Sequence, residues 1–251
     1  MNVAMVRVGI DMSSNTGGIY GPLLKDNTFE FIPIIDKDYH LDERTYGNTS
    51  GRYNRPFVEY FPPRRQAAMT DQPMHVDPEF ETFTYGDCPH PKTRRNPKCG
   101  LRRLQKDDVL IFYCGLEKWP FPGDRALYLI GHFEVEIAGL AMCLELDGVD
   151  VNEVFAQNFH VRHPAVYEYE REHLVLVKGS CFRPRASRLL KQAVKISEEG
   201  KNRAGRRQLV LSREMQQVFG NFHGNICIQR GLHWVDEDHV DSAAKFVRSL
   251  D

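Results

Sequence analysis

The chain has 251 residues, of which 41% are hydrophobic and 27% are charged, and this is the composition of an ordinary globular protein. No stretch approaches the roughly 18 consecutive apolar residues that a membrane-spanning helix requires, so an integral helical membrane protein is excluded. The first residues lack the charged and apolar regions of a secretory signal peptide, and we therefore expect a cytoplasmic location with the 6 cysteines reduced.

The formal net charge of −1 conceals an uneven distribution of basic residues. Residues 92–106 carry 7 Lys and Arg and no acid, and residues 183–213 carry 10 Lys and Arg against Glu198 and Glu199. Basic segments of this kind either follow the phosphates of a nucleic acid, dock an acidic protein partner, or are independently solvated loops. The sequence leaves these three alternatives open.

Short runs rich in apolar, β-branched and aromatic residues predict the strands. The clearest are residues 107–116 and 126–135, which are separated by a turn-like segment containing Pro120 and Gly123 and are expected to pair antiparallel. Further strands are predicted at residues 3–11, 29–35, 79–85 and 173–178. Residues 36–74 lack periodicity and are expected to form a long loop.

Helical periodicity is found mainly in the second half of the chain. It predicts helices at residues 151–157, 187–196, 213–219 and 236–250. The helix at 236–250 begins with three acidic residues and ends with Lys245 and Arg248, as the helix dipole favours.

Together these elements predict an α+β fold, with a mixed, largely antiparallel β core decorated by helices and a single domain over residues 1–251. The two strands and their connection at 107–136 resemble the central strands of PUA-like barrels, including the ASCH and EVE groups. That resemblance implies barrel elements in the core and binding of RNA or modified bases. Any buried antiparallel meander would give the same local pattern.

Three residues are candidates for acid–base catalysis. His75 and Asp77 lie in the segment with the densest functional groups, and an imidazole beside a carboxylate is the arrangement that general bases use. His160 is the third candidate. In the alternative interpretation, Asp77 caps a turn through Pro78 and His75 is an ordinary loop residue.

Polar residues and glycines at predicted strand ends are candidates for nucleotide binding. Glycines after the first strand would let backbone N–H groups approach an anion, although a plain glycine-rich connection fits equally. If residues 158–162 are extended, the amide of Asn158, the imidazole of His160 and the guanidinium of Arg162 point to one face, where they suit a base edge and a phosphate. In the alternative interpretation these residues are solvated strand ends. Aromatic side chains would stack on a base. The candidates are Asp11, Ser13, Ser14, Gly17, Gly18, Tyr85, Asp87, Tyr113, Asn158, Arg162, Lys178, Ser180, Arg188, Gln229 and Arg230.

Metal binding is weakly indicated by the sequence. Cys88, His90 and Cys99 are three potential ligands, but neither a Cys-x-x-Cys pair nor a fourth ligand at the usual spacing accompanies them. Ordinary thiols explain the cysteines better, and Cys114 and Cys143 are expected in the core. We therefore assign no metal ligand and no cofactor from the sequence.

A series of short motifs in a fixed order covers nearly the whole chain. They are Arg7-Val-Gly-Ile-Asp11, Gly18-x-x-Gly-Pro-Leu23, Phe29-Glu-Phe-Ile-Pro-Ile34, His75-Val-Asp-Pro-Glu-Phe80, Thr84-Tyr-Gly-Asp87, Asn158-x-His160-x-Arg162, Lys178-Gly-Ser180 and Gln229-Arg230. In order and spacing they resemble the third of the nucleotide-modification-associated domain families, from which the segment 88–103 departs. The resemblance implies a role in prokaryotic or viral nucleotide modification and no particular activity.

Three functions are therefore open, and the third is a structural or regulatory protein whose basic segments dock an acidic protein partner. The leading interpretation is a module that binds a modified base or nucleotide, in DNA or RNA, with the basic segments along the phosphates. The alternative is an enzyme acting on a nucleotide or nucleic acid, in which Asp77 and His75 or His160 exchange protons. We expect a nucleic acid or nucleotide as the partner and no membrane.

Overall fold

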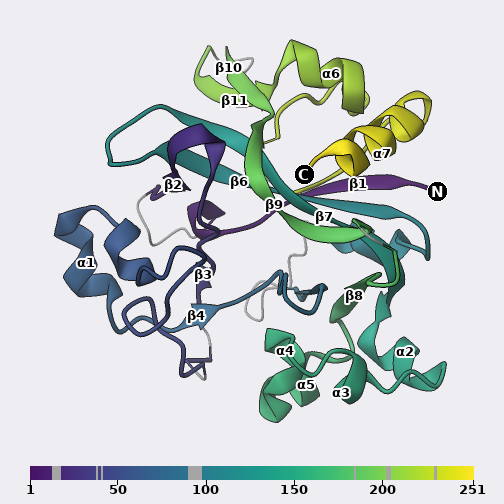
Figure 1. Ribbon diagram of the computed structural model, residues 1–251. Helices are drawn as coiled ribbons and strands as arrows, with labels where there is room; N and C mark the ends of the chain where they lie inside the picture. Colours follow the sequence, from purple (N-terminus) through teal and green to yellow (C-terminus); the bar gives the residue numbers. More distant parts are fainter. Residues whose placement is uncertain are drawn as a thin grey trace.

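The computed structural model describes residues 1–12, 18–37, 39–40, 42–89, 98–183, 185–201, 205–228 and 231–251 (Figure 1). The strands are β1 (Val3–Arg7), β2 (Gly21–Leu23), β3 (Ile34–Ile35), β4 (Met74–His75), β5 (Thr84–Asp87), β6 (Val109–Lys118), β7 (Arg125–Leu140), β8 (Val175–Gly179), β9 (Ser187–Lys195), β10 (Ser197–Lys201), β11 (Arg207–Leu211) and β12 (Leu232–Trp234). The helices are α1 (Pro63–Met69), α2 (Ala141–Leu146), α3 (Val151–Val154), α4 (Phe159–Arg162), α5 (Pro164–Glu170), α6 (Arg213–Phe219) and α7 (Val240–Ser249). The fold is α+β, as predicted.

Strands β6 and β7 form the centre of the main sheet, and their antiparallel pairing confirms the prediction. Most of their side chains are buried, because other elements cover both faces of these apolar runs. The strand order is β12–β1–β6–β7–β8–β5, with β2 also paired to β6 and β9 to β7. Strands β1 and β2 run parallel to β6, and the other pairs are antiparallel. The sheet is thus mixed and is not closed into a barrel.

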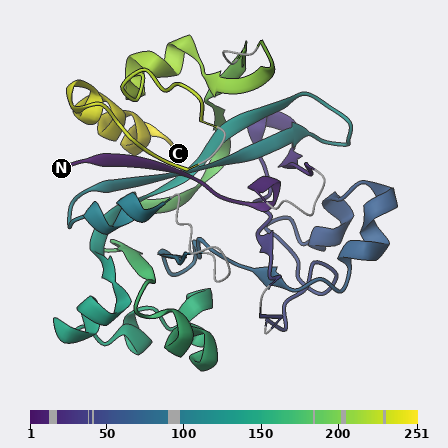
Figure 2. The same ribbon diagram turned by 180° about the vertical axis from the view of Figure 1, so that it is seen from behind.

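Helices cover the sheet from two sides. In the two opposite views, α6 and α7 lie on one side of the sheet, and α2 to α5 lie on the other (Figures 1 and 2). The predicted C-terminal helix is confirmed as α7, which buries Ala244 and Val247 and follows a 3-10 turn at Glu237–His239. None of the helices in the described part of the chain has the length and apolar character that crossing a bilayer requires.

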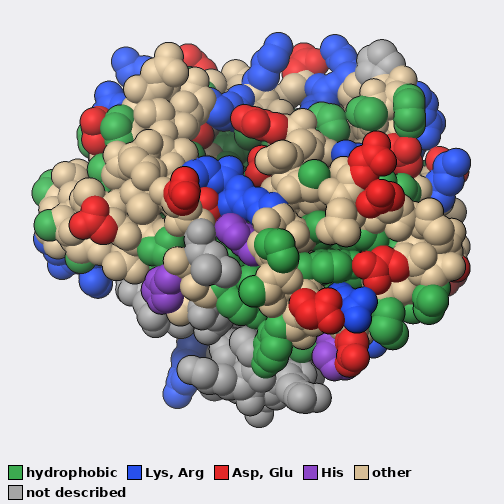
Figure 3. Space-filling model, turned by 90° about the horizontal axis from the view of Figure 1, so that it is seen from below, with side chains coloured by type: hydrophobic (Ala, Val, Ile, Leu, Met, Phe, Trp, Pro, Cys, Tyr) green, Lys and Arg blue, Asp and Glu red, His purple; other side chains and the backbone are tan. Residues whose placement is uncertain are grey.

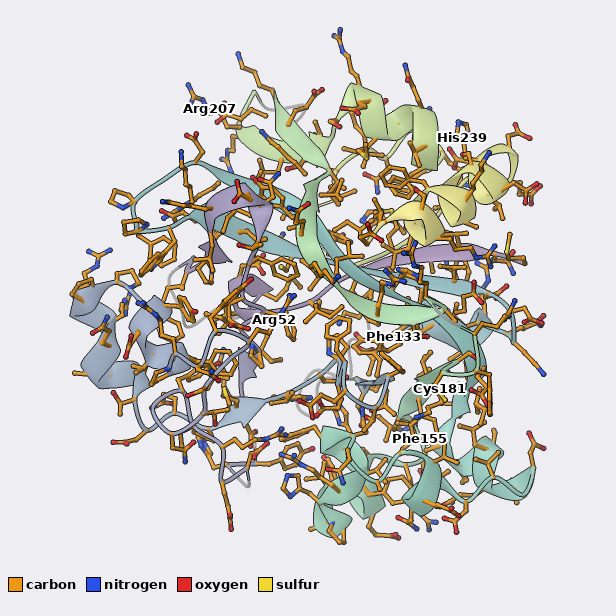
Figure 4. The ribbon with its side chains drawn as sticks, in the orientation of Figure 1. Arg52, Phe133, Phe155, Cys181, Arg207 and His239 are labelled. Carbon is orange, nitrogen blue, oxygen red and sulfur yellow. The ribbon has the colours of Figure 1, made fainter. Side chains whose placement is uncertain are left out.

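The buried apolar side chains form three clusters. The first surrounds the main sheet and includes Tyr85 and Phe133, the second includes Met74, and the third lies among α2 to α5 and includes Phe155. Figure 4 labels Phe133 at the sheet and Phe155 among the lower helices. Strands β5 and β4 and helix α4 contribute to different clusters. Polar residues between them are shielded from water and must find partners in one another.

The predicted helix at 187–196 is wrong, because this segment is strand β9, paired with β7. Its register shifts between Leu129 and Gly131 of β7, so that the buried residues of β9 fall at Ser187, Leu190 and Ala193. A spacing of three residues is also that of one helix face, which explains the error.

Other predictions were wrong in extent. The expected loop at 36–74 contains α1, which starts at a proline, the residue favoured at the first helical position. The expected strand at 29–35 is reduced to β3, and that at 79–85 starts only at Thr84 as β5. Cys114 is buried as expected, but Cys143 is exposed on α2.

Candidate functional site

A buried group of ionisable side chains lies where β4, β5, α4 and α5 meet. His75 ends β4 and is followed by Asp77, whereas His160 lies in α4 and Glu170 ends α5. A distance of 3.9 Å separates His75 Nε2 from Asp77 Oδ2, and 3.5 Å separates Asp77 Oδ2 from His160 Nε2. The structure therefore brings the three acid–base candidates together, and their roles remain a prediction.

Glu170 and Tyr39 hold the ring of His160. Glu170 Oε2 accepts a hydrogen bond from His160 Nδ1 at 2.5 Å, and Glu170 Oε1 accepts one from the Tyr39 hydroxyl at 2.7 Å. With Nδ1 engaged in this bond, Nε2 is the nitrogen that is directed at Asp77.

The backbone around His160 brings its ring against β5. Asn158 caps the N-terminus of α4, because its Oδ1 accepts a hydrogen bond from His160 N at 3.1 Å. Gly86 of β5 donates its N–H to Asp77 Oδ2 at 2.8 Å. A Cβ at position 86 would lie 2.6 Å from His160 Cδ2 and 3.0 Å from Asn158 Oδ1, so the ring occupies space that only a glycine leaves free.

Burial and mutual contact shift the pKa values in this group. Burial opposes the charged form of His160, but the hydrogen bonds and charges of Asp77 and Glu170 outweigh it and raise its pKa to about 10. Burial raises the pKa of Asp77 to about 6 despite the neighbouring His160. Burial, together with the charge of His160, holds the pKa of His75 well below its usual range. His75 is therefore a neutral imidazole near neutral pH.

Two polar atoms at this group are buried without a hydrogen-bond partner among the described residues, namely Asp77 Oδ1 and Asn158 Nδ2. An unpaired buried polar group costs about 1–3 kcal/mol. A bound ion, water molecule or ligand is one way in which such atoms are satisfied in native proteins.

His75, Asp77 and His160 offer the donor set of a metal site. Two imidazole nitrogens and one carboxylate oxygen all lie within 4.8 Å of one another, and no other such group of three occurs in the part of the chain that the structure describes. Three protein ligands of this kind hold a transition metal ion and leave coordination positions for water or substrate. An ion bound here would displace the proton that His160 carries near neutral pH, because only a neutral imidazole ligates a metal. Glu170 behind His160 and Gly86 behind Asp77 supply the outer hydrogen bonds that orient such ligands.

A model of the nucleotide modification associated domain 3 family matches residues 2–247. The chain belongs to this family. The match covers nearly the entire chain and confirms the resemblance that its motifs carry. It associates the chain with nucleotide modification. No curated protein and no solved structure gave a match.

In this member of the family, a second polar group adjoins the first. Lys98 Nζ donates to the Tyr85 hydroxyl at 2.7 Å and lies 3.3 Å from Asp87 Oδ1. Burial opposes the charged amine of Lys98, but Tyr85 and Asp87 outweigh it and raise its pKa. The charge of Lys98 in turn lowers the pKa values of both His75 and Asp77. Lys98 thus faces the interior, although the sequence placed it in a basic segment at the surface.

Two further candidates lie deeper in the fold. Asp11 is buried and accepts a hydrogen bond from Arg7 Nε at 2.9 Å, and burial raises its pKa to about 6 despite Arg7. Tyr113 is fully buried, and its hydroxyl donates to the carbonyl oxygen of Ile228 at 3.0 Å. The charges of Arg7 and Lys98 both act on the pKa of Tyr113, so these residues adjoin the group around Lys98.

Arg162 belongs to a partly buried ion-pair network. It pairs with Asp42, which also lies 3.2 Å from Arg44. Because residues 159–162 are helical, the expected extended arrangement of Asn158, His160 and Arg162 is wrong. Basic side chains gather in the middle of the face seen in Figure 3, with a histidine beside them.

The other described candidates make contacts outside the group around His160. Lys178 Nζ donates to Thr82 O at 2.6 Å, Arg188 Nη1 donates to Leu250 O at 3.1 Å, Ser180 Oγ accepts from Phe182 N at 3.4 Å, and Gly18 is exposed. Cys88 is half-buried and Cys99 is exposed, and neither belongs to the metal-ligand group. Six residues discussed above lie outside the described residues: Ser13, Ser14, Gly17, His90, Gln229 and Arg230.

Sequence reasoning missed Glu170, Tyr39 and Gly86. Tyr39 and Glu170 are 131 positions apart, and no local pattern connects them. Gly86 had a signal, because a glycine within a strand often marks the close approach of another group.

Proposed function

We propose that this chain is a metal-dependent enzyme of a nucleotide-modification system, acting on a nucleotide or a nucleic acid. The observation that carries the proposal is the convergence of His75, Asp77 and His160. These residues supply two nitrogens and an oxygen around one point, with Glu170 fixing the ring of His160 from behind.

Several features support an enzyme over the binding module. A structural metal site is closed by four protein ligands, whereas three ligands leave a position at which a reacting group can bind. Buried groups with strongly shifted pKa values are typical of reactive centres. The rings of Tyr85 and Tyr113, expected to stack on a base, are only 2% and 0% exposed. They therefore offer no stacking surface.

The chemistry follows from the roles of these groups. A bound divalent ion would polarise an oxygen of the substrate or activate a water molecule. Asp77 keeps one carboxylate oxygen, Oδ1, without a partner among the described residues. Glu170 and Tyr39 act as positioning residues, since Glu170 bonds to Nδ1 of His160 and Tyr39 bonds to Glu170.

The metal is tested by isothermal titration of Mn²⁺, Fe²⁺ under anaerobic conditions, and Zn²⁺ into chain freed of metal by chelation. We expect one ion per chain for the preferred metal. Loss of an outer hydrogen-bond partner weakens metal binding by about 10–100-fold. Asp77→Asn and His160→Ala should weaken it by more than this, because each removes a ligand. His223→Ala is the matched control, since this histidine is 83% exposed. Equal binding by all four chains would contradict the metal centre.

Catalysis is tested separately, by incubating the metal-loaded chain with nucleoside phosphates and oligonucleotides and analysing the products by mass spectrometry. Loss of product in Asp77→Asn with binding of the oligonucleotide retained supports the enzyme. Binding without any product in the wild type favours the module. Turnover that persists after chelation would contradict the metal and favour proton exchange by His75 and Asp77.

A further inference from the structure

A cleft that the site above does not use lies between the β6–β7 connection and the start of α1. It has a volume of about 730 Å³ and is lined by residues of both segments, including Trp119, Phe121 and Arg64. In Figure 1 the connection and α1 lie on the same side of the molecule. We propose that this cleft binds single-stranded nucleic acid and presents it to the metal centre, an inference that rests on the proposed function for its purpose.

The wall of the cleft on the β6–β7 side is aromatic. Phe121 lines the cleft, is half-buried and has no aromatic ring partner among the described residues, and in our proposal its ring is the platform for a base. Trp119 is also half-buried, and the Arg55 guanidinium lies 5.1 Å from its ring centroid. Aromatic rings of this kind stack on unpaired bases regardless of sequence.

The opposite wall carries the positive charge. Arg64 and Arg65 are exposed, and neither forms an ion pair with an acid in the described ranges. Glu117, the acid on the first wall, already pairs with Arg125 at 2.7 Å, and Glu59 with Arg55 at 3.5 Å. The unbalanced charge of the cleft is therefore positive and complements phosphates.

The cleft has a smaller neighbour that shares part of its lining. A second hollow of about 320 Å³ shares Ile19 and Arg65 with the first and is also lined by Lys37 and His40. These two residues flank Tyr39, whose hydroxyl donates to Glu170 behind His160. A strand that occupies both hollows would extend from the aromatic wall to His40, the neighbour in sequence of Tyr39.

This geometry favours a single strand over other forms of the ligand. The bases of a duplex are stacked on each other and cannot lie on Phe121 without unpairing. A mononucleotide would occupy only one of the two hollows, whereas a strand uses both.

The test is fluorescence anisotropy with labelled twelve-nucleotide oligothymidylate and oligouridylate across a salt series. Phe121→Ala should weaken binding by about fivefold or more, because it removes a stacking platform. The double change Arg64→Glu and Arg65→Glu should weaken binding at every salt concentration and reduce the magnitude of the slope of log affinity against log salt by about 1.4. The preferred oligomer distinguishes DNA from RNA.

Arg207→Glu is the matched charge control, because Arg207 is 83% exposed on the β10–β11 hairpin, at the upper edge of Figure 4. The proposal would be overturned if the cleft variants kept the wild-type affinity, or if Arg207→Glu lost as much affinity as they do. It would also be overturned if a duplex bound equally well, or if thymidine monophosphate competed as effectively as the oligomer. Metal titration of Phe121→Ala separates the two proposals. If Phe121→Ala still binds metal but no longer binds the oligonucleotide, the cleft is supported. If the chain binds the oligonucleotide but no metal, the cleft proposal stands and the metal centre is refuted.

Discussion

Glu170 contributes none of the three proposed ligand atoms, yet it decides which nitrogen of His160 is directed at Asp77. Its carboxylate is 5% exposed and accepts hydrogen bonds from both His160 and Tyr39. Removing the negative charge should leave the fold largely intact while loosening the ring of His160.

We therefore predict that Glu170→Gln lowers metal affinity by about 10–100-fold. It should also change the absorption bands of bound Co²⁺, which report ligand geometry and would not move if Glu170 only supported the fold. Glu168→Gln is the control, since that side chain is 70% exposed two positions earlier. Identical Co²⁺ spectra and affinities in wild type and both variants would refute the positioning role.

Glu30 gives a prediction about pH. Burial raises its pKa from 4.5 to about 7, against hydrogen bonds from the backbone of Arg52 and Tyr53 and the charge of Arg52. Because the folded pKa lies above the unfolded one, the protonated carboxyl stabilises the fold fully below pH 4.5, and this contribution is lost as the pH rises through about 7.

In urea denaturation between pH 5 and pH 8, the wild type should lose stability relative to Glu30→Gln, by an amount on the order of 3 kcal/mol at about 1.4 kcal/mol per pKa unit. The glutamine variant keeps the shape of the side chain without the titration. Parallel stability curves for the two proteins would show that Glu30 ionises freely in the fold.

Much of the candidate site was recognisable from single residues. His75, Asp77, Asn158 and His160 were all selected for their chemistry, and the structure places them together. Their outer partners were not, because hydrogen bonds such as that between Tyr39 and Glu170 depend on how distant segments pack. The same reason hid the metal-ligand set: no usual spacing joins His160 to His75.

At the scale of elements, the approach of α4 to β5 depends on Gly86. A methyl group there would meet the ring of His160 at 2.6 Å, and this ring is held on its other side by Glu170. Gly86→Ala should therefore displace His160 and weaken metal binding on the order of 10–100-fold, as do other changes that reorient a ligating histidine.

Titration of both metal and urea separates this local effect from general destabilisation. Gly139→Ala in β7 is the control, because its methyl group would meet only the flexible end of Leu144, at 3.1 Å. Unaltered metal affinity in Gly86→Ala would show that the contact between α4 and β5 does not set the geometry of the centre.

The elements themselves were predictable where their pattern is unambiguous. Strands β6 and β7 and helices α6 and α7 follow from long apolar runs and from dipole-matched charges. Strand β9 was not predictable in this way, because an irregular register gives its buried side chains a helical spacing. Helix α1 was missed although Pro63 marks its start.

At the scale of the whole molecule, the uneven charge of the sequence is partly neutralised by folding. In the basic segment 183–213, Arg183 pairs with Glu134 at 3.1 Å and Arg185 with Asp251 at 3.0 Å. The basic segments therefore offer fewer free charges to phosphates than the sequence suggests, whereas Arg64 and Arg65 outside them form no ion pair with described acids. The positive charge of Arg64 and Arg65 lies at the cleft beside α1, and this favours the cleft as the nucleic-acid site.

The whole fold also explains why one centre can be buried and still reactive. The side chains of Asp77 and His160 are almost fully buried, and this strengthens the electrostatic interactions between the groups there. The metal centre is thus the claim on which the proposed enzyme depends.

The most direct test is a crystal structure of the chain grown with Mn²⁺ or Fe²⁺, with diffraction recorded on both sides of the metal absorption edge. The account predicts a single anomalous peak at bonding distance from His75 Nε2, His160 Nε2 and a carboxylate oxygen of Asp77, absent in Asp77→Asn. A map without a peak there, at a metal concentration that saturates binding in solution, would contradict it.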